Sequence, residues 1–348
     1  MSVEQTNAKP LFHYLPQVVT YLKKQQPLLQ EFGIGKDFRV SPLACGEYNL
    51  NFLIQGQQRH VFRINMASQI GRKDQIIYEY NALKLLQESG VTPIPYFVDD
   101  SRAHIDRGIS IMEFLPGRPL EYKKDSHRAA KLFAKIHGTH IPQENNHLIA
   151  ETQPLTLIYN ECKGLLAKYF ASPLADPKIV KYLQIVLEWM KENKSRESFF
   201  QDNPWMCMVN TEVNSSNFII DSNKAFLVDW EMPRWGDPST DLCHFLSPLT
   251  TLWKTDFRFN EKEKKKFLKV YRQALSAPIL AESLQERMTI KMPYILLRGI
   301  SWSAMAHIGY QDGSLSICHE DTWKTLCNYM NLEFIQNIFA PFINTSRP

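Results

Sequence analysis

The sequence predicts an α+β protein with a small β-rich N-terminal lobe and a larger, mainly helical C-terminal lobe. Its length of 348 residues corresponds to about two domains of ordinary size. Short runs of β-forming residues, separated by turn residues, are concentrated between residues 38 and 64, which is typical of antiparallel strands. After residue 126 apolar residues recur mostly at helical spacing. The hinge is expected near residues 113–118, which gives lobes of 1–114 and 115–348.

The first lobe begins with a helical extension, residues 1–35, in which residues 11–33 predict one or two short amphipathic helices. The segments 38–54 and 60–64 follow and predict three short strands. A turn that contains Gly56 separates the last two of them, since glycine adopts turn conformations without steric cost.

A helix is expected over residues 73–89, because apolar residues recur there at helical spacing and Gly90 follows its end. Two prolines, Pro93 and Pro95, then break the chain before another strand at 109–114. In the second lobe a β-rich island at 217–229 interrupts predicted helices at 126–137, 155–170, 176–193, 261–275, 281–291 and 293–307.

Composition excludes several classes of protein. The net charge of +4, from 40 Lys and Arg against 36 Asp and Glu, is no footprint of a nucleic-acid-binding protein. No signal peptide is recognisable, and no stretch of about 18 residues is both apolar and free of charge, so no membrane partner is expected. The six cysteines form no C-x-x-C pair and are expected to be reduced. We expect a cytoplasmic protein.

The segment 210–241 carries the clearest chemistry. Two strand-like runs, 218–220 and 225–228, flank the turn residues 221–224 and predict a hairpin. The expected register places Asn217 beside Asp229, with backbones about 5 Å apart. An amide oxygen and a carboxylate there would suit a hard cation such as Mg²⁺, and Glu212 offers a second carboxylate on the preceding loop. The alternative is an ordinary surface hairpin with polar ends.

The order of several short motifs resembles the aminoglycoside phosphotransferase / choline kinase family, which has a protein-kinase-like fold. The segments V-D-W-E and G-D-P-S-T-D-L, at 228–231 and 236–242, match that family closely, whereas N-T-E-V-N-S-S-N at 210–217 matches its H-G-D-x-x-x-x-N loop only at the end. Further likenesses, which bring the similar part to residues 38–305, are A-C-G-E-Y-N-L-N at 44–51, F-R-I at 62–64, Y-E-Y-N-A-L at 78–83, I-M-E-F-L-P-G at 111–117 and L-F-A-K-I-H at 132–137.

For the first lobe the resemblance implies a nucleotide site. Arg63 would bind the α- and β-phosphates of ATP or GTP, and Glu79 would hold Arg63. Gly46 would belong to the loop over the phosphates. Glu113 and Phe114 would contact the purine through backbone groups. An arginine suits the phosphate role because its guanidinium is always charged and forks onto phosphate oxygens.

For the second lobe the resemblance implies catalysis and an acceptor site. Asn217 and Asp229 would hold Mg²⁺, and Glu212 would be the catalytic base for transfer of the γ-phosphoryl group to the hydroxyl of a small molecule. Asp237 and Asp241 are expected to brace the structure. No P-loop motif G-x-x-x-x-G-K-[ST] and no G-x-S-x-G motif is present, which argues against a P-loop NTPase and an α/β-hydrolase.

The catalytic loop departs from the family pattern at two positions. Glu212 stands where the family has Asp, and Asn210 stands where it has His. Glutamate also accepts a proton, but its extra methylene changes its reach, and a misplacement of about 1 Å can cost about 10²-fold in rate. Two hypotheses therefore stay open: an active phosphotransferase, and a nucleotide-binding pseudokinase or scaffold with weak or no transfer.

Overall fold

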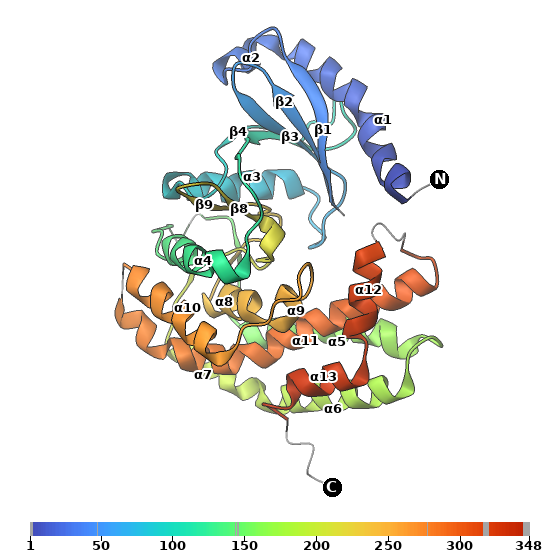
Figure 1. Cartoon of the computed structure of the whole chain (residues 1–348), viewed down its shortest axis with the longest axis vertical. Coiled ribbons are helices and arrows are strands. Elements are labelled where there is room, and N and C mark those ends of the chain that lie inside the picture. Colours follow the sequence, from blue (N-terminus) through green and yellow to red (C-terminus); the bar gives the residue numbers. More distant parts are fainter. Residues whose placement is uncertain are drawn as a thin grey trace. The chain divides into compact units, whose positions relative to one another are not determined.

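The computed structural model describes residues 3–46, 48–142, 144, 146–276, 278–315 and 320–343 (Figure 1). Contacts divide the chain into two compact units. The first comprises Met1–Pro119, Thr139–Leu148 and Asn217–Pro233, and the second comprises Leu120–Gly138, Ile149–Ser216 and Arg234–Pro348. Each unit contains several separate segments of the chain. The lobes expected at 1–114 and 115–348 therefore stay a prediction.

The first unit contains a five-stranded antiparallel sheet with the order β1-β2-β3-β5-β4. Its strands are β1 (Arg39–Cys45), β2 (Asn49–Gln55), β3 (Arg59–Asn65), β4 (Pro95–Asp99) and β5 (Ile109–Glu113). The three strands expected near the start of the lobe and the strand at 109–114 are thus confirmed. Strand β4 was not expected, because Pro95 indicated a break; it lies at the edge of the sheet, where a missing N–H is tolerated.

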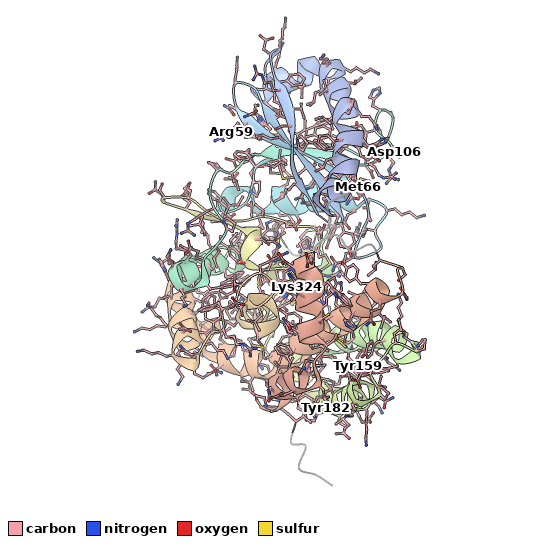
Figure 2. All side chains as sticks on the ribbon, turned by 45° about the vertical axis from the view of Figure 1, so that its right-hand side comes forward. Arg59, Met66, Asp106, Tyr159, Tyr182 and Lys324 are labelled. Atoms are coloured by element: carbon pink, nitrogen blue, oxygen red, sulfur yellow. The ribbon has the colours of Figure 1, made fainter. Side chains whose placement is uncertain are left out.

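Helix α1 (Val3–Lys24) and helix α2 (Gln26–Glu31) precede the sheet, and α3 (Gln75–Leu86) with a 3₁₀ turn (Gln87–Ser89) confirms the helix expected at 73–89. Helix α1 covers one face of the sheet, where its buried side chains share a core with Phe52 and Phe62. Hydrogen bonds also hold it: the Tyr21 hydroxyl donates to Asp99 Oδ2 at 2.7 Å, and the Tyr14 hydroxyl donates to Asp106, which lies beside this helix in Figure 2.

The side chains of each strand point alternately to the two faces of the sheet. In β2 and β3 the buried Leu50, Phe52, Ile54, Phe62 and Ile64 belong to the core shared with α1. Residues between them point to the opposite face, since successive side chains of a strand alternate. The β2–β3 register pairs Asn51 with Arg63, so two polar side chains meet on that second face.

The first unit also contains the expected hairpin, formed by β8 (Phe218–Ile220) and β9 (Ala225–Leu227). The expected register is wrong by one residue, because Phe218 pairs with Leu227 and Val228 N donates to Asn217 O at 2.8 Å. The turn explains the shift: Asp221 N donates to Lys224 O, and the Asp221 carboxylate accepts from Asn223 N at 2.6 Å. The loop therefore closes over two residues, and Asn217 lies opposite Val228 instead of Asp229.

The second unit is mainly helical and contains a small sheet with the order β6-β10-β7. Its remaining elements are β6 (Ile149–Ala150), β7 (Cys207–Val209), β10 (Arg234–Gly236), α4 (Tyr122–His137), α5 (Pro154–Ala171), α6 (Pro177–Asn193), a 3₁₀ turn (Lys194–Glu197), α7 (Ser198–Asp202), α8 (Ser239–Leu246), α9 (Pro248–Thr251), α10 (Glu261–Ala274), a 3₁₀ segment (Pro278–Ser283), α11 (Leu284–Gln311), α12 (Glu320–Tyr329) and α13 (Leu332–Phe339); a 3₁₀ turn (Ser215–Asn217) crosses the unit boundary.

The helices expected at 126–137, 155–170, 176–193 and 261–275 are present. Those expected at 281–291 and 293–307 are one helix, α11, which continues through the buried Pro293. A proline inside a helix costs about 3 kcal/mol, but α11 packs against both α5 and α8, and this burial outweighs the loss of one backbone bond.

Two expectations about the whole chain can be compared with the described residues. None of their helices is long and apolar enough to cross a membrane. Free thiols are present at Cys45, Cys162, Cys207, Cys243 and Cys327, while Cys318 lies outside the described residues.

Candidate active site

A cavity of ≈ 220 Å³ lies within the first unit, on the face of the sheet opposite α1. Apolar side chains form most of its wall, and Arg63, Glu79 and Asp229 form its polar end. The lining residues are Leu43, Ala44, Asn51, Val61, Arg63, Glu79, Leu83, Pro93, Met112, Glu113, Phe114, Leu115, Ile219, Val228, Asp229 and Trp230. The structure thus brings together five residues singled out in the sequence: Arg63, Glu79, Glu113, Phe114 and Asp229.

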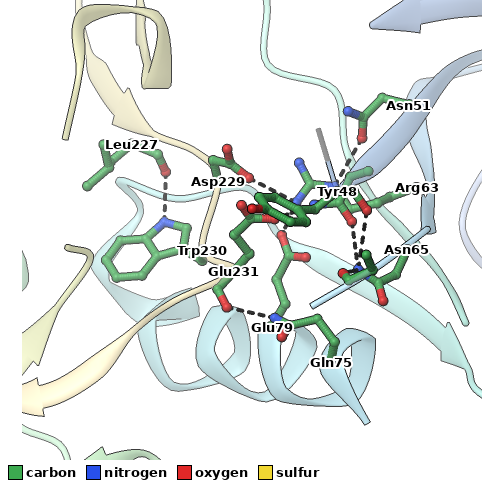
Figure 3. A network of polar contacts seen from close by, with 12 residues as sticks. Tyr48, Asn51, Arg63, Asn65, Gln75, Glu79, Leu227, Asp229, Trp230 and Glu231 are labelled. Carbon is green, nitrogen blue, oxygen red and sulfur yellow. Dashed lines mark hydrogen bonds and ion pairs between the residues drawn. The ribbon is translucent and has the colours of Figure 1, made fainter. Parts of the chain in front are cut away.

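Arg63 lies at the centre of the polar end (Figure 3). Its Nε donates to Asn51 Oδ1 at 3.0 Å, and its Nη1 donates to Glu79 and, at 3.4 Å, to Asp229 Oδ1. Burial disfavours the charged guanidinium, but the carboxylates of Glu79 and Asp229 raise the pKa of Arg63 above its ordinary value. The side chain is therefore a fixed cation whose orientation three neighbours determine.

Glu79 lies on α3 and is 2% exposed. Burial raises the pKa of Glu79 from its ordinary range to about 7, against the opposing attraction of Arg63. Desolvation outweighs the ion pair here, because a buried carboxylate loses its hydration before it gains one partner. Near neutral pH this carboxyl group therefore exchanges a proton while it faces the cation.

Replacement of Glu79 by Gln is expected to remove a pH dependence of stability. The folded protein keeps the Glu79 proton up to a pKa of about 7, whereas an unfolded Glu releases it near a pKa of about 4.3. The unfolding free energy of the wild type relative to E79Q should therefore fall as pH rises from about 5 to about 7, by at most about 1.4 kcal/mol per pH unit. Denaturant titrations across this range measure it. E88Q, at an exposed carboxylate beside α3, is the control; parallel curves for E79Q and wild type would contradict the expectation.

Asp229 follows β9 with a backbone φ of 64°. This left-handed conformation is uncommon outside glycine but is tolerated by Asp. The next residue anchors the segment: Trp230 is fully buried, and its indole N–H donates to Leu227 O at 3.0 Å. Trp230 therefore packs in the core and fixes the backbone from which the partly exposed Asp229 carboxylate projects into the cavity.

The segment 113–115 forms another wall of the cavity. Glu113 N donates to Ile94 O at 2.8 Å and Phe114 N donates to Arg59 O at 3.4 Å, so these amides are already used. Leu115 N has no hydrogen-bond partner among the described residues. Sequence reasoning missed Leu115, which offers the amide that a ligand could meet.

Gly46 lies in the turn between β1 and β2, and its N–H donates to Asn49 O at 2.9 Å. It does not line the cavity. A Cβ at this position would meet only Asn49 O, at 3.6 Å, so nothing in the described protein requires a glycine there. Its role in a phosphate loop stays a prediction.

The loop that contains Glu212 belongs to the second unit and follows β7. Asp241, on α8, accepts hydrogen bonds from Asn210 N and Thr211 N, each at 2.8 Å. The Asn210 side chain accepts in turn from Glu212 N at 3.0 Å, as expected of a residue that stabilises the loop backbone. Thr211 has a φ of 71°, an unfavourable value for a β-branched residue. The loop is thus held in one strained conformation.

Asp241 also belongs to a buried chain of hydrogen-bonded polar groups that includes His137 and Tyr271. His137 Nε2 lies 3.3 Å from Asp241 Oδ2, and His137 Nδ1 lies 3.0 Å from the Tyr271 hydroxyl. Because the carboxylate only accepts, Nε2–H donates to Asp241, and Nδ1 shares a hydrogen bond with the Tyr271 hydroxyl. Asp237 serves a separate structural purpose, accepting from Ser239 N at 2.9 Å and binding the Arg287 guanidinium.

Comparisons with known proteins agree with this architecture. The model of the phosphotransferase enzyme family matches residues 39–282. Among curated proteins no match is found.

Solved structures resemble the chain over most of its length. An ethanolamine kinase from Plasmodium vivax has a TM-score of 0.60 at 14% identity, covering 86% of this chain and 84% of that one. A spectinomycin phosphotransferase solved with ADP and spectinomycin has a TM-score of 0.59 at 12% identity, covering 90% and 96%. An amicoumacin kinase solved with AMP-PNP and Ca²⁺ has a TM-score of 0.57 at 16% identity, covering 92% and 95%. The α+β, protein-kinase-like fold class expected from the sequence is confirmed.

Proposed function

We propose, from the premise that this chain belongs to the phosphotransferase enzyme family, that it transfers the γ-phosphoryl group of ATP or GTP to a hydroxyl group of a small molecule. The observation that carries the proposal is the cavity of the first unit, in which apolar walls end at Arg63 and Asp229. Phosphoryl transfer requires that a protein hold the triphosphate, offset its charge and align the acceptor.

The cavity has the groups that a nucleoside triphosphate needs. Apolar side chains such as Val61, Leu83 and Val228 line it and would enclose a purine. The free amide of Leu115, with the carbonyls of Glu113 and Phe114, would supply hydrogen bonds to the base. Arg63, held by Asn51 and Glu79, would bind phosphate oxygens.

Oxygen ligands suited to Mg²⁺ are available in the same unit. Asp229 is the principal ligand in this proposal and Asn217 the second, because hard cations prefer carboxylate and amide oxygens. The metal ion would neutralise charge on the transferred phosphoryl group when bound. Mg²⁺ bound with the nucleotide would also give the Asp229 carboxylate a second positively charged partner beside Arg63.

We assign Glu212 as the base that accepts the proton of the acceptor hydroxyl. Support comes from its loop, whose two preceding amides are bound to the buried Asp241, so the carboxylate projects from a fixed backbone. The acceptor would bind in the part of the chain after residue 114. The second candidate, a nucleotide-binding pseudokinase or scaffold, is favoured by the replacement of the family's Asp and His by Glu212 and Asn210.

Glu212 variants separate the two functions. With Mg²⁺, ATP or GTP and a panel of small alcohols, E212Q is expected to lower kcat by about 10²- to 10⁴-fold, because general-base assistance is lost. E212D should keep activity within about tenfold of wild type or exceed it, since the carboxylate remains. Transfer is measured as the phosphorylated alcohol formed from the γ-phosphate of ATP or GTP.

A full rate in E212Q would show that Glu212 is not the base. A wild-type protein that transfers nothing, yet melts at a higher temperature with Mg-ATP, would establish the nucleotide-binding alternative. No transfer and no binding would overturn the proposed function.

A further inference from the structure

We propose that Glu231 is a positioning residue. It holds the turn that contains Gly46, and helix α3, against the segment that carries Asp229. It does so through a buried hydrogen bond with Asn49, the first residue of β2, and through its own backbone carbonyl. This inference rests on the proposed function, because the three elements that it joins are those assigned to the triphosphate and its metal ion.

The contact between Asn49 and Glu231 joins residues that are far apart in sequence. Asn49 Nδ2 donates to Glu231 Oε2 at 2.6 Å, and the two residues are 5% and 6% exposed. Asn49 closes the turn that contains Gly46, since Gly46 N donates to Asn49 O. A short hydrogen bond from a buried amide to a carboxylate is among the stronger neutral-to-charged contacts. The base of the loop is therefore fixed to the residue two positions after Asp229.

The orientation of the Asn49 amide is determined from both ends. Its Oδ1 accepts from Asn65 Nδ2 at 3.1 Å, and Asn65 Nδ2 also donates to Ala67 O at 2.8 Å. The Asn49 amide therefore presents its N–H group, not its oxygen, to position 231. A hydrogen-bond acceptor is required there, which Glu231 supplies.

Helix α3 is attached to the same segment. Gln75 Nε2 donates to Glu231 O at 2.6 Å (Figure 3). The side-chain carbonyl of Gln75 accepts from the Ser68 hydroxyl at 2.6 Å. Gln75 and Glu79 are four residues apart and share one face of the helix. Fixing Gln75 to the backbone of Glu231 therefore fixes the turn of α3 from which Glu79 reaches Arg63.

The charge of Glu231 has an effect distinct from its hydrogen bonds. Together with Glu79 and Asp229, it contributes to the negative potential that keeps the pKa of Arg63 raised. A glutamine at this position could still accept from Asn49, but it would not supply that charge. Variants at the two positions can therefore separate geometry from electrostatics.

The consequence is a specific pattern of kinetic loss. Because the contact orders the elements that hold the nucleotide, its removal should raise the KM and the Kd for Mg-ATP more than it lowers kcat. E231A and N49A are each expected to weaken Mg-ATP binding about tenfold, and the double variant should lose less than the product of the two single losses, since both substitutions remove the same contact. N49D should bind Mg-ATP most weakly of these variants, because it places two carboxylates next to each other in a buried site.

The decisive variant is N49D/E231Q, in which donor and acceptor are exchanged. The carboxylate introduced at position 49 would accept from the amide introduced at position 231, so Mg-ATP binding should recover to within about threefold of E231Q. Kd is measured by displacement of a fluorescent ATP analogue, which does not require turnover, and KM and kcat are measured in parallel. N328A and E192A, at exposed positions of the second unit, control for the loss of an amide and a carboxylate.

The outcomes distinguish this inference from the function on which it rests. A wild type that binds Mg-ATP, with additive losses in the double variant or no recovery in N49D/E231Q, overturns the positioning role alone. Unchanged Kd in E231A and N49A does the same. A wild type that binds no Mg-ATP overturns the proposed function, and the positioning role with it.

Discussion

D229N is expected to lower phosphoryl transfer by about 10³-fold or more while leaving the fold intact. The substitution removes the anionic oxygen that a hard cation prefers, together with the charge that Arg63 faces at 3.4 Å, and such electrostatic groups are among the largest contributors to catalysis. Asparagine is nearly isosteric and tolerates the φ of 64° found at this position. The loss should therefore come from chemistry and not from unfolding.

Two measurements test this expectation. The kcat of D229N should rise only at Mg²⁺ concentrations well above those that saturate the wild type, whereas its denaturant midpoint should change little. D37N, at an exposed aspartate of the same unit, serves as the matched control and should behave as wild type. Equal kcat values for D229N and wild type at ordinary Mg²⁺ would rule out Asp229 as the metal ligand.

D241N is expected to lower kcat by about 10²-fold and to destabilise the protein by about 2 to 4 kcal/mol. The Asp241 carboxylate accepts from Asn210 N, Thr211 N and His137 Nε2. An asparagine has one oxygen and would turn its NH₂ group toward one of these donors, leaving it unsatisfied in a fully buried place. The strained Thr211 would then relax, and Glu212 would lose its fixed backbone.

A graded variant separates catalysis from stability. Y271F removes only the outermost bond of the chain, at His137 Nδ1, and should cost about 1 kcal/mol of unfolding free energy with a small change in kcat. Denaturant titration and steady-state kinetics of both variants give the comparison. A D241N protein with wild-type kcat would show that this brace does not position the catalytic loop.

How far the sequence predicts this fold depends on the length of each element. Helix α3 and the strands near residues 39–65 leave clear periodic or turn signals. Strands β6, β7 and β10 contain only two or three residues each, too few for any period to emerge. The hairpin of β8 and β9 was predictable from its turn residues, but its register was not, because the Asp221 side chain shortens the loop by hydrogen-bonding two residues ahead.

The residues of the candidate site likewise include some that the sequence indicated and some that it did not. Arg63, Glu79 and Asp229 were singled out because their residue types match family motifs, and the structure places all three around one cavity. Asn51 was missed, although the turn at Gly56 already implies its position opposite Arg63 in a hairpin. Leu115 and Asn49 left no such signal, since their roles depend on which backbone amides other strands leave unused and on contacts between distant segments.

The two faces of the N-terminal sheet have a practical consequence for where the folded first unit begins. The family match starts at residue 39, yet the side chains that shield Phe52 and Phe62 come from α1, which precedes that point. A domain boundary drawn from the match would cut through a hydrophobic core and leave aromatic rings in water on the face of the sheet opposite the cavity that Arg63 and Asp229 line. Helix α1 is therefore an integral layer of the first unit, and it covers one face of the sheet that carries Arg63.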